Sequence, residues 1–244
     1  MKLTPMMQQY MDTKEQYKDC LLFYRLGDFY EMFFEDAEIA SRELEITLTG
    51  RDCGFDERAP MCGVPWHSVH NYIAKLIHKG YKVAICEQME DPALAKGIVK
   101  REVTRIITPG TVTDPSMLEE KKNNFLMAVY NLQTYFGIAI VDITTGEFYA
   151  TQISFGNTTK KLMDEIYRYQ PSEILVNKQI QSVLSLQDFR EKTGIYISLL
   201  EDGAFDRTSA EKSIKDISGS NPLQQQELAV CASGALLHYL KATQ

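Results

Sequence analysis

The spacing of apolar residues in the first half of the chain changes between the helical and the strand period, which predicts a mixed α/β domain. Met6, Met7 and Tyr10 recur at helical spacing after Thr4-Pro5, a pair that favours the start of a helix. A mostly apolar run then ends at Gly27, as expected for a buried strand. The full pattern predicts strands over residues 21–26, 46–49, 82–86 and 99–108, and further helices beginning at Asp28 and Ser68.

The second half of the chain begins again with strands. Three β-rich runs, at residues 124–132, 134–143 and 147–154, predict an antiparallel meander. A helix over 158–169, a strand over 173–176 and a closing helix over 228–240 follow, whereas residues 180–225 are weakly patterned. Three antiparallel strands, a helix and another strand form the order of a ribonuclease-H-like α/β domain.

Pro109-Gly110 separates the two halves, because both residues interrupt regular structure. The following segment contains Pro115 and a Glu-Glu-Lys-Lys run, which favours a linker over a surface turn within one domain. We therefore predict a first domain over residues 1–112, a linker over 113–124 and a second domain over 125–244.

Composition excludes several classes of protein. Apolar residues make up 44% and charged residues 24% of the 244, which is typical of a globular chain. No apolar run approaches the roughly 20 residues of a membrane span, and no signal peptide is expected at the N-terminus. The five cysteines form neither a disulfide framework nor a CxxC motif, so a cytoplasmic location is expected and a metal site around Cys62, His67 and His70 is not favoured.

The sequence contains none of the common nucleotide-binding or hydrolase motifs. No phosphate loop, Gly-x-Gly-x-x-Gly run or Gly-x-Ser-x-Gly elbow occurs among its 14 glycines, so we expect no enzyme activity. The ribonuclease-H-like order leaves a metal-dependent nuclease as an alternative, with Asp142 joined by Glu147 and Glu173. The favoured interpretation is that Asp142 caps the turn Asp-Ile-Thr-Thr-Gly through its side chain.

The segment Phe29-Tyr30-Glu31 presents an aromatic ring and a carboxylate separated by one residue, at the predicted start of a helix. Such a ring can wedge into a duplex step, and a carboxylate can accept a hydrogen bond from a base edge. From the residues alone, the favoured interpretation is instead that Phe29 is a core aromatic on the apolar side of a helix. The net charge of −7 argues mildly against nucleic acid, but it bounds only the non-specific electrostatic attraction, which another part of a larger assembly could supply.

Four segments in order closely resemble the N-terminal mismatch-recognition domain of the MutS family of DNA mismatch repair proteins. They read LFYRLGDFYEMF from Leu22, PMCGVPWH from Pro60, VAICEQ from Val83 and REVTRIITPGT from Arg101. The resemblance continues through Asp-Ile-Thr-Thr-Gly at Asp142 to Cys-Ala-Ser-Gly-Ala-Leu-Leu at Cys231. It covers essentially the whole chain and implies a recognition domain followed by a ribonuclease-H-like connector domain.

The resemblance assigns the family's Phe-x-Glu motif to Phe29 and Glu31. It implies that Phe29 stacks on the mispaired base from the minor groove while Glu31 hydrogen-bonds that base. It also implies mismatched or looped double-stranded DNA as ligand, MutL as a partner of the connector, and nucleoid association. The family protein is longer, forms a homodimer and carries an ATPase domain, for which ATP and magnesium are expected. No cofactor is expected for these residues, and an interaction scaffold remains an alternative function.

Three further residues are candidate DNA contacts. Arg51 lies in a polar loop predicted over residues 50–60, where a phosphate or groove contact and an exposed loop charge are equally favoured. Met61 and Gly63 lie in a predicted loop over 61–65, and Gly63 permits close approach of the backbone. Other side chains have structural predictions: Trp66, His67 and His70 pack or cap the next helix, and Lys96, Lys100, Arg101 and Arg105 form a solvated basic cluster with both arginines on one face.

Overall fold

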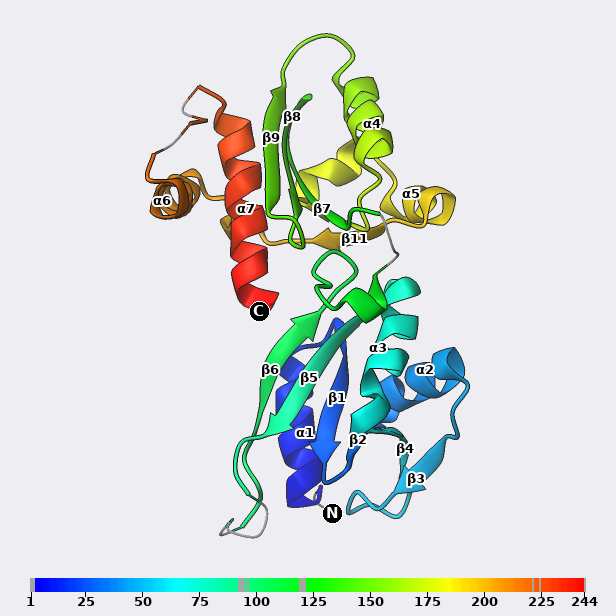
Figure 1. The fold of residues 1–244 in the computed structure, drawn as a ribbon. Helices are drawn as coiled ribbons and strands as arrows, with labels where there is room; N and C mark the ends of the chain where they lie inside the picture. Colours follow the sequence, from blue (N-terminus) through cyan, green and yellow to red (C-terminus); the bar gives the residue numbers. More distant parts are fainter. Residues whose placement is uncertain are drawn as a thin grey trace. The chain divides into compact units, whose positions relative to one another are not determined.

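The computed structural model of the chain describes residues 3–91, 95, 97–118, 122–220, 222–223 and 225–243. The chain folds into two compact units that meet in sequence between Thr108 and Pro109. Both units are mixed α/β structures, as predicted (Figure 1). None of the helices in the described residues is long and apolar enough to cross a membrane.

The first unit is built on a six-stranded sheet with the order β3-β4-β2-β1-β5-β6. Strands β1 and β5 run parallel, and the other described pairs are antiparallel. The elements are α1 (Pro5–Gln16), β1 (Cys20–Leu26), β2 (Phe29–Phe33), α2 (Phe34–Leu44), β3 (Thr49–Arg51), β4 (Ala59–Pro65), a 3₁₀ turn (Trp66–Ser68), α3 (Val69–His78), β5 (Lys82–Gln88) and β6 (Arg101–Ile107).

Helices cover both faces of this sheet because its strands alternate buried side chains between two cores. Leu22 on β1 packs with Met7 and Tyr10 of α1. On the opposite face, the Cys62 thiol of β4 donates a hydrogen bond of 3.4 Å to the Ala37 carbonyl of α2. Figure 1 shows α1 on one side of the sheet and α2 with α3 on the other.

The predicted helices at Thr4 and Ser68 and the strands at 21–26, 82–86 and 99–108 are confirmed. Three predictions for the region between them are wrong. The helix expected from Asp28 begins only at Phe34, because residues 29–33 form β2. The strand expected over 46–49 is β3 at Thr49–Arg51, and the predicted loop over 61–65 belongs to β4.

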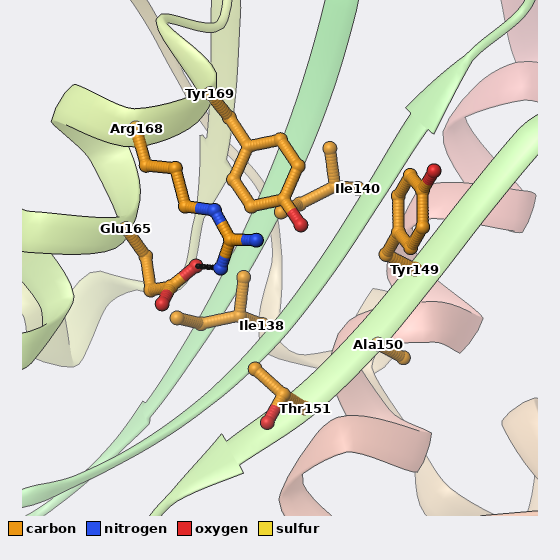
Figure 2. A pocket seen from close by; sticks show the side chains of 8 residues that line it. All are labelled: Ile138, Ile140, Tyr149, Ala150, Thr151, Glu165, Arg168 and Tyr169. Carbon is orange, nitrogen blue, oxygen red and sulfur yellow. Dashed lines mark ion pairs between the residues drawn. The ribbon is translucent and has the colours of Figure 1, made fainter.

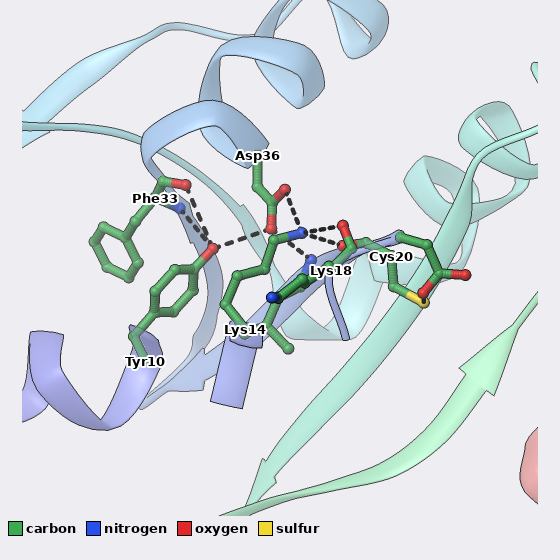
Figure 3. A network of polar contacts seen from close by, with 8 residues as sticks. Tyr10, Lys14, Lys18, Cys20, Phe33 and Asp36 are labelled. Carbon is green, nitrogen blue, oxygen red and sulfur yellow. Dashed lines mark hydrogen bonds and ion pairs between the residues drawn. The ribbon is translucent and has the colours of Figure 1, made fainter. Parts of the chain in front are cut away.

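A buried polar network joins α1 to the junction between β2 and α2 (Figure 3). Asp36 at the start of α2 is buried, and its carboxylate accepts a hydrogen bond of 3.0 Å from the Leu22 amide. Lys14 of α1 pairs with the same carboxylate at 2.9 Å. The pairing satisfies the buried charge and fixes the place at which the strand turns into a helix.

The second unit contains a five-stranded sheet with the order β11-β10-β7-β8-β9. Strands β7, β8 and β9 form the predicted meander, and β10 runs parallel to both β7 and β11. The elements are β7 (Phe125–Leu132), β8 (Tyr135–Asp142), β9 (Glu147–Ile153), α4 (Thr158–Tyr169), β10 (Glu173–Val176), α5 (Leu186–Thr193), β11 (Tyr196–Leu199), α6 (Arg207–Ser218) and α7 (Glu227–Thr243). This order confirms the ribonuclease-H-like prediction.

Helices α4 and α7 cover opposite faces of the second sheet (Figure 1). Leu162 of α4 packs against Ile138 and Ile140 of β8, whereas Leu236 of α7 packs against the intervening Ala139. The weakly patterned residues 180–225 form α5, β11, α6 and short 3₁₀ turns, which the sequence did not predict. These elements bury few apolar residues, Phe189 in α5 and Ala210 and Ile214 in α6, and the one buried residue of β11 is Ser198.

The segment between β6 and β7 begins with two residues that are hydrogen-bonded to the second unit. The Pro109 carbonyl accepts a hydrogen bond of 3.1 Å from the Asn124 amide group, and the Gly110 N–H donates one of 3.0 Å to Glu173. Pro115–Met117 form a 3₁₀ turn, with Met117 buried. Residues 119–121 of the predicted linker lie outside the described residues.

Candidate nucleic-acid interface

Phe29 is the first residue of β2 and follows a two-residue turn. Gly27 adopts a left-handed conformation with φ +59°, which a glycine accommodates without steric cost. The chain therefore reverses at once, and Phe29 pairs with Leu26 across the hairpin. The residue is 46% exposed and lies in a strand, so Phe29 is neither at a helix start nor a core aromatic.

The strand places Glu31 on the same face of the sheet as Phe29. Side chains two residues apart in a strand point to one face, and the residues between them point to the other. Tyr30 and Met32 are accordingly buried on the opposite face. The Phe-x-Glu spacing thus brings an exposed ring and a carboxylate side by side because it matches the strand period.

Met61 and Gly63 lie on β4, directly beside β2. Gly63 is opposite Glu31, and Met61 is opposite Phe33. A Cβ atom at Gly63 would lie 3.3 Å from the Tyr30 carbonyl oxygen and 3.4 Å from Cγ of Glu31. The glycine therefore leaves the space that the Glu31 side chain needs.

Arg51 ends β3, the next strand of the sheet, and its guanidinium forms an ion pair with Glu31. Nη1 of Arg51 donates to Oε2 of Glu31, and the guanidinium carbon lies 6.0 Å from the centre of the Phe33 ring. The Arg51 side chain is 39% exposed and that of Glu31 is 17% exposed. Arg51 is thus engaged with a carboxylate and is not a solitary loop charge.

A hollow of about 590 Å³ opens on this part of the sheet. Its lining includes four of the five predicted DNA-contact residues, and the fifth, Arg51, pairs with one of them. The lining residues are Phe29, Glu31, Glu45, Ile46, Thr47, Thr49, Met61, Cys62 and Gly63. The structure therefore gathers residues from three separate sequence segments, 29–31, 45–49 and 61–63, into one surface, which together with Arg51 we call the Phe29 face.

A cluster on the opposite face of the sheet supports the turn that carries Phe29. The Arg25 guanidinium lies over the rings of Tyr30, at 5.4 Å, and Trp66, at 4.8 Å. Tyr30 donates a hydrogen bond to Glu87, and burial, followed by that bond, raises the pKa of Tyr30 to about 12. The Trp66 amide donates to the turn carbonyl of residue 28 at 2.9 Å.

The supporting role of Arg25 and Glu87 was missed at the sequence level. The signal that could have found it is the strand alternation of residues 29–33, which buries Tyr30 beside β1. Trp66 packs against Arg25 of β1, a contact that its predicted role at the next helix did not include, and its indole lies edge-on to the imidazole of His67 at 6.4 Å.

Comparisons with known proteins decide the family. Residues 4–116 match the model of MutS domain I, and residues 124–244 match that of MutS domain II. The chain belongs to the MutS family. It is 60% identical over 99% of its length to the DNA mismatch repair protein MutS of Ruminiclostridium cellulolyticum and 61% identical over 99% to that of Acetivibrio thermocellus.

A third MutS relative, from Lachnoclostridium phytofermentans, is 54% identical over the whole of this chain. The chain spans 28%, 28% and 26% of the lengths of these three relatives. The Phe29 face lies within the residues that match MutS domain I, and the ribonuclease-H-like unit lies within those that match MutS domain II.

The basic cluster of MutS domain I does not form a single surface. Arg101 donates hydrogen bonds to the Arg25 carbonyl at 2.8 Å and to Gln9 of α1 at 3.0 Å, so its charge is used internally. The pairing of β5 with β6 shifts register between Ile85 and Cys86. This irregularity places Arg105 on the face opposite to Arg101, so the prediction that both share one face is wrong.

Lys100, in the same predicted cluster, is exposed and pairs with Glu102 at 2.6 Å. Lys96 lies outside the described residues. The described members of the cluster therefore give no continuous basic surface.

In MutS domain II, Asp142 is fully buried and caps its own turn, as predicted. Its Oδ1 accepts hydrogen bonds from the backbone N–H of Thr144 at 2.9 Å and from the Thr144 hydroxyl at 2.6 Å. Its Oδ2 accepts from the Asn124 N–H at 3.3 Å. These donors occupy both oxygens of the carboxylate proposed as a metal ligand in the nuclease alternative.

Of the other two carboxylates of that alternative, Glu147 lies directly opposite Asp142 in the pairing of β8 with β9, whereas Glu173 is bonded elsewhere. Glu173 is buried and accepts hydrogen bonds from Ser198 at 2.6 Å and from Tyr239 at 2.7 Å. Glu147 is exposed at the start of β9. Within the described part of the chain, no three His, Cys, Asp or Glu side chains are grouped to hold a metal ion.

A smaller hollow of about 240 Å³ lies between α4 and strands β8 and β9 (Figure 2). Its two charged residues, Glu165 and Arg168, pair with each other at 3.8 Å. Tyr149 and Tyr169 provide aromatic walls, with ring centres 5.9 Å apart. The paired charges leave this hollow without an unbalanced group to recognise a ligand.

Proposed function

We propose that this chain binds mismatched or looped double-stranded DNA in DNA mismatch repair, with the Phe29 face as its reading surface. The observation that carries the proposal is the exposed Phe29 ring at the start of β2, two residues from Glu31 on one open face. The names of the similar proteins, each a DNA mismatch repair protein, support it.

In the proposed mechanism, Phe29 enters the minor groove and stacks on the mispaired base. A mismatched step costs less to unstack and kink than a paired one, so insertion converts lost pairing energy into selectivity. Stacking tolerates different bases, because each base presents a π face. A short β-turn suits this insertion, because Phe29 directly follows the turn and its backbone is held by strand pairing.

Glu31 then accepts a hydrogen bond from the displaced base. A carboxylate that approaches a polyanion weakens general affinity, so such a contact serves recognition rather than attraction. Met61 and Gly63 border the same hollow, where Gly63 lets the backbone come close to the groove. Arg51 adds the positive charge on this face.

The unit that matches MutS domain II is proposed to act as a connector. In this role it couples DNA binding to the ATPase domains of the longer family protein and offers a surface to MutL, within a homodimer. The 244 residues contain no phosphate loop, so we assign ATP hydrolysis to other parts of the family protein.

The proposal is tested by binding a duplex with one G·T mismatch and its matched counterpart, at one stated salt concentration, to the full-length protein. Phe29→Ala should remove about 1–3 kcal/mol of mismatch preference, the usual contribution of one stacked base. Phe148→Ala is the matched control, because this phenylalanine is 41% exposed on β9 of the other unit.

A mismatch preference that survives Phe29→Ala would refute the wedge assignment. The 244-residue chain by itself should bind weakly even if the reading surface is intact, because its net charge is −7. Nanomolar mismatch binding by that isolated chain would contradict this expectation.

A further inference from the structure

We infer that Arg51 is a positioning residue whose effect on DNA recognition passes through Glu31, so that it sets mismatch specificity rather than general affinity. The inference rests on the proposed function of the Phe29 face. It differs from the expectation that Arg51 contacts a phosphate, and the difference can be measured.

The sheet brings Arg51 and Glu31 together although 20 residues separate them in sequence. Arg51 lies opposite Ala59, and Glu31 lies opposite Gly63, both on the intervening strand β4. Opposed residues and residues two apart share one face, so both side chains project from the same side of the sheet. The pair is thus fixed by strand register, not by the flexibility of a loop.

The ion pair leaves part of the Glu31 carboxylate available. Nη1 of Arg51 donates to Oε2, and among the described residues no hydrogen bond to Oε1 is formed. Glu31 lines the hollow, so this second oxygen can accept from a base while the first remains paired. Arg51 in turn lies against the Phe33 ring, which limits the positions of its guanidinium.

The charge of Arg51 also offsets an electrostatic cost of the proposed contact between Glu31 and DNA. A carboxylate that enters the groove of a duplex is repelled by phosphates on both strands. A guanidinium held beside it offsets that repulsion at the place where the base is read. Because the offset acts on Glu31, removing Arg51 should impair the contact that discriminates mismatched from matched DNA.

A double-mutant cycle in the full-length protein separates the two roles. The four proteins are wild type, Arg51→Met, Glu31→Gln and the double variant, each bound to G·T-mismatched and matched duplexes at two salt concentrations. Arg51→Met should reduce the ratio of mismatched to matched affinity by about tenfold in the wild-type background. In the Glu31→Gln background it should change that ratio by less than about twofold.

Two further variants complete the test. Arg58→Met removes a positive charge from an exposed neighbouring position and should leave the ratio unchanged. Arg51→Lys should restore part of the ratio, because it returns the charge without the planar guanidinium. Thermal unfolding of each variant verifies that the domain is folded.

The inference is overturned if Arg51→Met weakens binding to the mismatched and the matched duplex by the same factor, in both the wild-type and the Glu31→Gln background. In that case it should also lower the slope of log affinity against log salt concentration by about one unit. That result would make Arg51 a phosphate contact. Phe29→Ala, measured in parallel, separates the two ideas. If Phe29→Ala leaves the mismatch preference intact, the proposed function is refuted. If Phe29→Ala removes the preference but Arg51→Met keeps it, only the inference about Arg51 is refuted.

Discussion

The hydroxyl group of Tyr10 on α1 donates a hydrogen bond of 3.2 Å to the buried carboxylate of Asp36 on α2 (Figure 3). The same hydroxyl accepts from the backbone N–H of Phe33 at 3.3 Å, where β2 ends. Burial, followed by the charge of Asp36, raises the pKa of Tyr10, so it remains a neutral hydrogen-bonding group. The network therefore anchors the inner end of the strand whose outer end exposes Phe29.

Asp36→Ala should lower the free energy of unfolding of the first unit by about 3–5 kcal/mol. The substitution leaves Lys14 without its carboxylate and removes the acceptor of the Tyr10 hydroxyl and the Leu22 amide. Urea unfolding measures the effect. Glu35→Ala is the matched control, since its exposed neighbouring carboxylate should change stability by less than about 0.5 kcal/mol. Equal losses for both variants would contradict the importance of the network.

Gly137→Ala should destabilise the second unit by about 1–3 kcal/mol or more, through overpacking. A Cβ atom at Gly137 on β8 would lie 1.9 Å from the carbonyl oxygen of Leu228 on α7, so the helix has to move away from the sheet. Gly203→Ala is the control, because a Cβ atom there would meet no heavy atom within 4 Å. Thermal unfolding should separate the two variants, and similar melting temperatures would show that α7 adjusts freely.

Asp142→Asn should reduce the stability of the second unit by about 1–3 kcal/mol, because one oxygen that accepts hydrogen bonds becomes an amide group. The donors affected are Thr144 and Asn124. Glu147→Gln, at an exposed position, should be nearly neutral. Incubation of the wild type and both variants with labelled duplex and divalent metal tests the nuclease alternative. Metal-dependent cleavage that disappears with Asp142→Asn would establish a catalytic role instead.

Stability should fall as the pH rises above about 9. Burial raises the pKa of the Cys20, Cys62 and Cys86 thiols from the ordinary value of 9.0 to about 12. The unfolded chain therefore ionises its thiols first, and the folded state, which keeps these protons, loses stability between about pH 9 and pH 12.

Urea midpoints at about pH 8 and about pH 10 test this expectation. Cys62→Ala should show a smaller decrease than the wild type, because it removes one of the three groups. A thiol reagent should react with the native chain slowly, since all five cysteines are buried. Midpoints that do not change with pH would contradict the proposed ionisation.

The residue pattern alone predicted the elements whose apolar period is unambiguous. The meander of β7, β8 and β9, the helices α3 and α4, and the strand β5 follow from local spacing, because each element buries one face or both in a regular way. The side-chain cap at Asp142 was likewise predictable, since an Asp that starts a Thr-Thr-Gly turn bonds its own backbone.

The pattern failed where one set of apolar residues fits two periods. Phe29, Met32 and Phe33 suit a helical stripe as well as a strand, and only the reversal at Gly27 and the pairing with β4 decide for the strand. Strand β4 was missed because Pro60, Gly63 and Pro65 resemble loop residues. A strand position depends on its neighbours, which sequence spacing does not specify.

The sequence by itself determined which residue types are available for the Phe29 face, and the resemblance to the MutS family pointed to Phe29 and Glu31. Tertiary structure decided which face each residue occupies. Register across β2, β4 and β3 sets Glu31 beside Gly63 and in contact with Arg51, whereas a register shift in β5 and β6 separates Arg101 from Arg105. The physical reason is that a displacement of one residue moves a side chain to the other face of a sheet, and long-range pairing alone fixes that displacement.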